Sequence, residues 1–240
     1  MNYLDKVYNL DWKKYNDLVY NSISFKYFPK EEFEIETITP VDILYELEEE
    51  KIIYIPISKN ASTSITNSLN FRPVTTFVPP NSKFYLDYID IPEKYRSGYK
   101  FLVITRDPQK RWISGINEFL NERPDFDEDD IKSYDKFIIE LKNNKFIFDC
   151  HTRPQFSWID FCFRYDLDIT FLKLDENLNE KISNILGRQV TINHYNPIQK
   201  YESKIKNYKF CYDILTKYCM KNKNFLNLHE MDFYLYNNSL

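Results

Sequence analysis

Two short polar segments combine cationic and hydroxyl side chains in a way that suits the binding of an anion. The first, Ser58–Ser64, has the sequence SKNASTS, and the second begins at Arg106 and continues through Arg111 and Ser114. A lysine ammonium, an arginine guanidinium and serine or threonine hydroxyls all donate hydrogen bonds to phosphate or sulfate oxygens. These residue types therefore indicate the recognition of a phosphorylated compound.

Each segment follows a run of apolar residues that predicts a buried strand, Ile52–Ile57 for the first and Phe101–Thr105 for the second. A helix is expected after each, over Ser62–Leu69 and Pro108–Asn121. Ligands of open α/β sheets bind at the carboxyl ends of strands, where a helix N-terminus adds N–H donors and partial positive charge. The two segments are therefore expected to form an anion cradle.

The first segment is not a nucleoside-triphosphate P-loop. It lacks the glycines of that motif, and Lys59 precedes the small residues instead of following them. An ordinary nucleotide triphosphatase is therefore disfavoured. Taken singly, each segment also has a structural interpretation: a serine-rich helix cap with an exposed lysine, and a surface ion pair between Arg106 and Asp107.

The remaining patterns predict an α/β fold. Strands that alternate with helices favour a P-loop-like three-layer sandwich, with a mostly parallel central sheet of about four or five strands flanked by helices. We expect a single domain over residues 1–240, made of an N-terminal arm (1–45), a nucleotide-binding core (52–186) and a C-terminal helical region (200–240). The other predicted elements are helices over Leu10–Tyr20, Val41–Glu50, Tyr134–Asn143, Glu176–Leu186 (capped by Gly187) and within Lys200–Lys221, a strand over Ile169–Leu174, and a solvated acidic loop over Asp125–Asp130.

Charge and apolar patterning narrow the classes of partner. The net charge of −4 does not favour nucleic-acid binding. No stretch of about 20 apolar residues predicts a membrane span, and the first twenty residues lack the apolar core of a signal peptide, so we expect a soluble, cytoplasmic protein. The surplus of Lys, Asn, Ile, Tyr and Phe is typical of an AT-rich genome, such as that of a virus, a phage or some bacteria.

The cysteines and histidines do not predict a metal site. Cys150, Cys162, Cys211 and Cys219 form no Cys-x-x-Cys pair, so free thiols are expected. A bond between Cys211 and Cys219 is disfavoured, because eight residues on a helix separate their Cα atoms by about 12 Å. No His, Cys and Asp cluster has metal-ligand spacing.

The two polar segments together resemble a known family. Ile55–Thr63 (IPISKNAST) resembles the 5′-phosphosulfate-binding loop of sulfotransferases that use 3′-phosphoadenosine 5′-phosphosulfate (PAPS), and Arg106–Gly115 (RDPQKRWISG) resembles their 3′-phosphate-binding motif. The resemblance implies transfer of a sulfuryl group from PAPS to an acceptor hydroxyl, with release of 3′-phosphoadenosine 5′-phosphate (PAP) and without a metal.

The resemblance also implies a role for each residue of the two motifs. Lys59 would contact the bridging oxygen of the phosphosulfate and stabilise the leaving phosphate. Arg111 would support either the 3′-phosphate or the packing of its helix. The remaining donors fall into two groups: those for the 5′-phosphate are Asn60, Ala61, Ser62 and Thr63, and those for the 3′-phosphate are Arg106 and Ser114.

A third segment, Asp149–Gln155 (DCHTRPQ), resembles the His-x-x-Pro-Gln stretch of the carbohydrate sulfotransferase branch, which includes the heparan 2-O-sulfotransferase type. This resemblance implies that His151 is the general base. Glu118, on the helix after Ser114, is a second candidate for that role, and Arg153 and Gln155 are expected to contact the acceptor. A glycan is the favoured acceptor, while a small hydroxyl compound, a lipid or a protein tyrosine stays open.

Two other functions remain open, a small-molecule kinase with a similar phosphate cradle and a non-catalytic nucleotide-binding protein of the same fold. His194 and His229 are expected to be packing or surface residues. The sequence does not indicate an oligomeric state.

Overall fold

The computed structural model describes residues 9–28, 43–75, 93–122, 131–193 and 209–240. The chain forms two compact units. The helical unit contains Met1–Phe33, Pro108–Pro154 and Asn196–Asp232, and the sheet unit contains Glu34–Asp107, Gln155–Tyr195 and Phe233–Leu240. The predicted acidic loop Asp125–Asp130 and the first part of the predicted helix Lys200–Lys221 lie outside the described residues.

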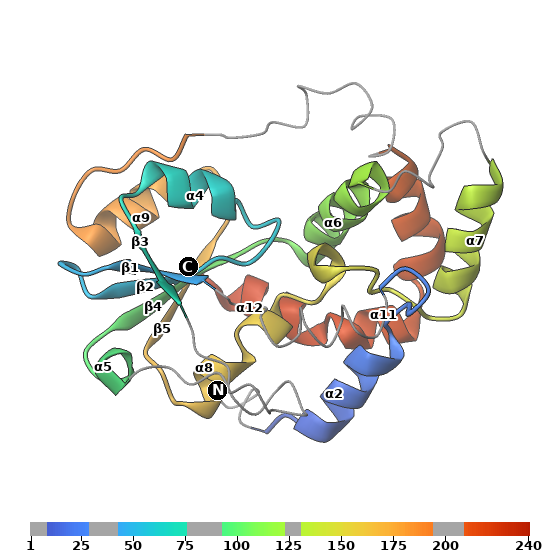
Figure 1. Ribbon diagram of the computed structural model, residues 1–240, viewed down its shortest axis with the longest axis horizontal. Helices are drawn as coiled ribbons and strands as arrows, with labels where there is room; N and C mark the ends of the chain where they lie inside the picture. The colour runs from blue at the N-terminus through green and yellow to red at the C-terminus, as the bar shows by residue number, and fades with distance from the viewer. Residues whose placement is uncertain (1–8, 29–42, 76–92, 123–130, 194–208) are drawn as a thin grey trace. The chain divides into compact units, whose positions relative to one another are not determined.

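The sheet unit is built on five strands in the order β3-β1-β2-β4-β5 (Figure 1). Strand β2 pairs in parallel with β4, and β4 with β5, whereas β1 pairs antiparallel with both β2 and β3. The α/β class is therefore confirmed, with a mixed open sheet in place of the mostly parallel one expected. The strands are β1 (Ile43–Leu47), β2 (Ile52–Ile55), β3 (Arg72–Thr75), β4 (Lys100–Thr105) and β5 (Ile169–Lys173).

The prediction of a helix over Val41–Glu50 is wrong, because β1 occupies its centre. Leu44 and Leu47, three residues apart, match a helical period, but Tyr45 pairs with Tyr54 across the sheet and Leu47 pairs with Ile52. Pairing with β2 and β3 decides the conformation, since strand formation depends on neighbouring strands more than on local preference. Strand β3 was not predicted; its Pro73 is typical of an edge strand.

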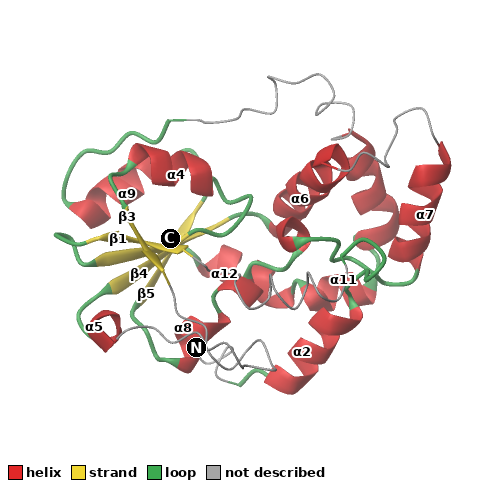
Figure 2. Ribbon diagram, in the orientation of Figure 1, coloured by secondary structure: helices red, strands yellow, loops and turns green. Residues whose placement is uncertain are grey.

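One face of the sheet is covered by α4 (Ser62–Ser68) and α9 (Leu178–Leu186), which share an apolar core with it (Figures 1 and 2). Both helices lie within two residues of their predicted bounds. Gly187 ends α9 in the left-handed conformation, with φ 64°, as predicted for a helix cap. The shorter elements of this unit are α5 (Glu93–Arg96), the 3-10 turn η2 (Phe156–Trp158) and α8 (Asp160–Arg164).

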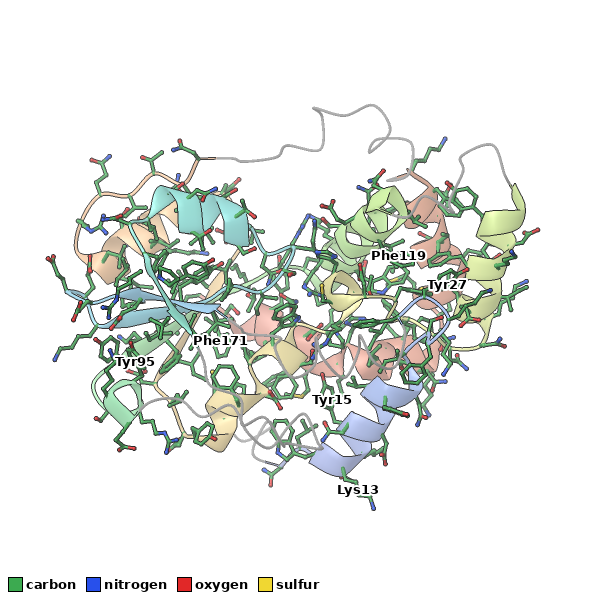
Figure 3. The ribbon with its side chains drawn as sticks, viewed as in Figure 1. Lys13, Tyr15, Tyr27, Tyr95, Phe119 and Phe171 are labelled. Atoms are coloured by element: carbon green, nitrogen blue, oxygen red, sulfur yellow. The ribbon has the colours of Figure 1, made fainter. Side chains whose placement is uncertain are left out.

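The helical unit has an aromatic core. Phe119, Phe137 and Phe148 contact one another with ring centroids 4.5–6.2 Å apart, and the Tyr27 ring lies edge-on to Phe119 at 5.7 Å. Tyr27 and Phe119 are labelled in Figure 3. Such contacts explain much of the aromatic surplus by packing. The elements are α2 (Trp12–Asn21), α6 (Pro108–Glu122), α7 (Ile131–Lys142), the 3-10 turn η1 (Cys150–Thr152), the π-helical turn η4 (Leu215–Cys219), α11 (Lys223–Leu228) and α12 (Glu230–Asn238), whose last part belongs to the sheet unit.

Three further features concern the cysteines, membrane-spanning helices and metal ligands. All four cysteines are free, and three of them are buried. Over the described ranges, no helix has the length and apolar character needed to cross a bilayer. The same residues contain no group of three or more potential metal ligands.

A buried carboxylate joins β1, β3 and the segment around α5. Glu46 is 1% exposed and lies opposite Arg72 in the register of β1 and β3. Arg72 donates hydrogen bonds to it, as do the hydroxyls of Tyr99 (2.8 Å) and Tyr95 (3.2 Å). Burial raises the pKa of Glu46, but the hydrogen bonds from Arg72, Tyr99 and Tyr95 outweigh burial, so the pKa lies below its ordinary value.

We expect Glu46→Gln to lower the free energy of unfolding at pH 7 by about 2 kcal/mol, because the buried hydroxyls lose a charged acceptor. Since the pKa of Glu46 is lowered in the folded state, its stabilisation is present above pH 4.5 and disappears as the pH falls below that value. Urea unfolding between pH 3 and pH 7 should therefore show a shallower acid loss in the variant. Glu48→Gln, an exposed partner of the same arginine at 3.9 Å, is the matched control and should change little; equal effects of both variants would contradict the prediction.

Candidate functional site

The loop between β2 and α4 has an unusual backbone. Lys59 and Ala61 adopt positive φ angles of 67° and 61°, which non-glycine residues rarely do and which cost of order 1–3 kcal/mol each. Ala61 is the N-cap of α4, and its carbonyl accepts the first helical bond, from Ile65 N–H at 3.0 Å. Left-handed residues in such loops can turn successive N–H groups toward one side, as in anion-binding nests. Lys59 and Ala61 thus adopt backbone conformations that glycine enters without steric cost.

The second predicted segment begins next to this loop. Ile55, the last residue of β2, is paired with Val103 in the parallel register, so β2 ends beside β4 two residues before β4 itself ends at Thr105. Arg106 follows β4, and its Nη1 donates a hydrogen bond of 2.7 Å to the carbonyl oxygen of Lys59. The structure therefore brings together the two cationic residues that the sequence placed at the ends of separate strands.

Two buried amide side chains hold these loops. The Asn60 Nδ2 donates to the Ile104 carbonyl (2.7 Å) and to the Gln155 Oε1 (2.6 Å). Gln155 Oε1 also accepts from the Arg106 N–H (2.9 Å), while Gln155 Nε2 donates to the Arg106 carbonyl (2.7 Å). Asn60 and Gln155 are 0% and 2% exposed. These hydrogen bonds of Gln155, which was expected to contact the acceptor, all go to protein groups.

One polar atom of this network has no hydrogen-bond partner among the described residues. It is Asn60 Oδ1, which is buried, and a buried amide oxygen seldom lacks a partner. A water molecule or a ligand that donates a hydrogen bond would satisfy it. The predicted hydroxyl donors follow in the first turn of α4, where Ser62 is partly buried and Thr63 is exposed.

The other predicted site residues lie in the helical unit. Arg111, on α6, is 1% exposed and donates a hydrogen bond to the Arg153 carbonyl. Arg153, expected to bind the acceptor, is itself 2% exposed, whereas Ser114 is partly buried. For Arg111, burial and a backbone partner support helix packing, one of the two roles that the sequence left open.

Gly115 allows a backbone segment to approach α6. A Cβ atom at this position would lie 2.4 Å from the His151 carbonyl oxygen and 2.8 Å from the His151 carbonyl carbon. The face of α6 at Gly115 is therefore filled by the 3-10 turn η1, which contains the predicted base. Because both contacted atoms belong to the backbone, they cannot move aside for a Cβ atom as the end of a flexible side chain could.

Asp149 organises that turn with both of its carboxylate oxygens. Its Oδ1 accepts from the Thr152 N–H at 3.0 Å, and the Thr152 hydroxyl accepts in return from the Asp149 N–H at 3.1 Å, which makes a capping box. Its Oδ2 lies 3.0 Å from His151 Nδ1. Burial lowers the pKa of His151, but hydrogen bonds to Asp149 and Cys150 outweigh burial and raise it to about 10. The imidazole therefore carries a proton at neutral pH.

Of the two remaining histidines, His194 lies outside the described residues. His229 is buried, and its Nδ1 lies 2.9 Å from Asp232 Oδ2, an arrangement in line with the packing role expected for it.

The sequence identified the cationic residues but missed how they are held. The roles of Asn60, Gln155 and Asp149 depend on hydrogen bonds whose partners the sequence pattern does not specify. A clue was available only for Asp149, which stands three residues before Thr152, the spacing of a capping box.

Comparisons with known proteins found no relative of this chain. No family model matches the chain, and neither the curated proteins nor the solved structures include a significant match. The chemistry of the candidate site must therefore be inferred from its own residues.

We expect Gly115→Ala to lower the free energy of unfolding by about 1–3 kcal/mol, because the new methyl group would overlap the His151 backbone and force η1 away from α6. Chemical denaturation measures the loss. Lys110→Ala, an exposed change on the same helix, should stay within about 0.5 kcal/mol of the wild type. A Gly115→Ala protein as stable as the wild type would show that η1 does not depend on this approach.

We expect Asp149→Asn to lower the pKa of His151 from about 10 toward its ordinary value of 6.5, because the amide keeps the cap but removes the negative charge. Since protonated His151 is stabilised in the folded state, that stabilisation is complete below pH 6.5 and is lost as the pH rises through about 10. An NMR titration of the ring protons measures the shift, and the sequence has only three histidines to assign. Asp175→Asn, an ion-paired carboxylate of the sheet unit, is the control; an unchanged His151 titration in Asp149→Asn would contradict the assignment.

Proposed function

We propose that this chain is a sulfotransferase that transfers the sulfuryl group of PAPS to an acceptor hydroxyl, with a carbohydrate as the favoured acceptor class. The observation that supports this proposal best is the hydrogen bond between Arg106 and the Lys59 loop. It joins the two segments whose sequences resemble the 5′- and 3′-phosphate-binding motifs of one enzyme family. Either motif alone would support the proposal less, because a single cation at a strand end is also common in surface ion pairs.

The donor set of the joined loops fits a nucleotide with two anionic groups. Lys59 would neutralise charge on the 5′ side, with hydrogen bonds from Ser62, Thr63 and the backbone of Asn60 and Ala61. The Arg106 guanidinium donates a hydrogen bond to the Lys59 carbonyl oxygen and would bind the 3′-phosphate through its planar fork of donors. When bound, PAPS supplies the activated sulfuryl group. The residues supply position and positive charge, which dominate catalysis of group transfers of this kind.

His151 is proposed as the acid–base residue, with Glu118 as the alternative. A general base must be deprotonated before it takes the acceptor proton, whereas the raised pKa keeps His151 protonated at pH 7. If His151 is the base, turnover should therefore rise with pH toward about 10. A contact of Ser114 with the 3′-phosphate and a role for Arg153 in acceptor binding both stay predictions.

The proposal also includes a three-layer arrangement of helices on both faces of the sheet. Contacts of Tyr95 with Glu46 favour α5 on the sheet face opposite α4 and α9, which would give a P-loop-like three-layer arrangement. A cytoplasmic location and a reaction without a metal ion also remain part of the proposal.

We expect PAP to raise the melting temperature of the wild type, and Arg106→Ala to weaken PAP binding by about 10- to 100-fold through loss of a charge-assisted contact. Arg188→Ala, which removes an exposed arginine of the sheet unit, is the matched control for Arg106→Ala and should bind PAP as the wild type does.

Lys59→Ala should lower both PAP affinity and turnover, whereas His151→Ala should mainly lower turnover. Turnover is measured with radiolabelled PAPS and a glycan panel.

Two outcomes would contradict the proposal in different ways. Stabilisation by ATP with Mg²⁺ but none by PAP would indicate a kinase. Binding of PAP without any sulfated product across glycans, small hydroxyl compounds, lipids and tyrosine peptides would indicate a nucleotide-binding protein without this activity.

A further inference from the structure

Strand β4 extends beyond the end of its neighbour β2. The pairing of β2 with β4 ends at Ile55 and Val103, while the pairing of β4 with β5 continues to Thr105. Backbone groups of successive strand residues point alternately to the two neighbouring strands. Since the Thr105 carbonyl accepts from Leu174 on the β5 side, Ile104 and Arg106 face the side that β2 has left.

Beyond the end of β2, two amide side chains bind the backbone groups that a longer β2 would have bound. Asn60 Nδ2 donates to the Ile104 carbonyl, and the Gln155 amide bonds both the N–H and the carbonyl of Arg106, as a paired strand would. The Asn60–Gln155 bond of 2.6 Å joins the two amides to each other. Because both side chains are buried, these bonds are shielded from water and hold the geometry tightly.

We propose that Asn60 and Gln155 are positioning residues that fix the Lys59 loop against Arg106, so that both cations act on one bis-phosphorylated nucleotide at the same time. This inference rests on the proposed function. Neither amide needs to touch the nucleotide. Their effect should appear as cooperation between the two phosphate sites: a ligand with both phosphates gains from the fixed spacing, and a ligand with one phosphate does not.

The chemistry of the position explains why an amide is required at Gln155. Its oxygen accepts two hydrogen bonds, and its nitrogen donates one to the Arg106 carbonyl. In Gln155→Glu, an ionised carboxylate keeps the first two bonds but places a second acceptor against that carbonyl. A protonated carboxyl group has an O–H that can donate again. The variant should therefore regain its function on acidification.

The experiment measures the affinities of PAP, adenosine 5′-monophosphate and adenosine 3′-monophosphate by calorimetry at pH 5 and pH 8. At pH 8 we expect Gln155→Glu to bind PAP at least about tenfold more weakly than the wild type, the scale of one buried hydrogen bond. The affinities for the two monophosphates should change less than about threefold, since each engages one loop. At pH 5 the difference from the wild type in PAP affinity should shrink.

Gln189→Glu is the matched control, because it makes the same change of charge at an exposed position of the sheet unit. It should bind all three ligands as the wild type does at both pH values. Asn60→Ala removes the bond between the two amides without adding a charge, and serves if Gln155→Glu does not fold at pH 8. It should likewise weaken PAP binding selectively.

The possible results separate the two proposals. A wild type that binds no PAP would overturn the proposed function. A wild type that binds PAP, with variants that leave its affinity unchanged or weaken PAP and both monophosphates equally, would overturn the positioning role and leave the proposed function standing. Loss confined to PAP, with recovery of Gln155→Glu at pH 5, supports the inference.

Discussion

The buried hydrogen bonds at the carboxyl end of β4 are the constraint on which the candidate site depends. Backbone groups taken out of water need partners, and β2 ends too early to provide them for Ile104 and Arg106. Asn60 and Gln155 meet this need. By doing so they bring the Lys59 loop and the Arg106 loop within hydrogen-bonding distance. The requirement to satisfy a strand end thus also places the Arg106 side chain against the backbone of Lys59.

Close backbone packing has the same importance in the helical unit. Gly115 lets the η1 turn lie directly on α6, and the capping box of Asp149 and Thr152 fixes the shape of the turn. The same arrangement orients the His151 ring, because the Asp149 carboxylate that caps the turn also lies within hydrogen-bonding distance of the ring. The proposed acid–base residue is therefore oriented by groups whose first role is to satisfy the backbone.

Electrostatics in this protein are local. The net charge of the chain is −4, yet the candidate phosphate loops contain Lys59 and Arg106 within one hydrogen-bonded network. The carboxylates described in detail are neutralised by near partners, Glu46 by Arg72 and Asp149 by the His151 ring. Short-range arrangements of this kind can favour an anionic ligand on an acidic protein, because interactions between exposed charges are screened within about 10 Å in ordinary salt.

Local signals in the sequence, namely apolar runs, proline starts and a glycine cap, were enough to predict β2, β4, β5 and the helices α4, α6 and α9. The sequence also placed Lys59 and Arg106 at strand ends. Tertiary structure alone decided that residues 43–47 form a strand, because its partners β2 and β3 lie elsewhere in the chain. It likewise decided the partners of Gln155, which binds Arg106 across 49 residues of sequence. Periodicity encodes which face of an element is buried, whereas a single amide bond between distant residues leaves no repeating pattern and is set only when the chain has folded.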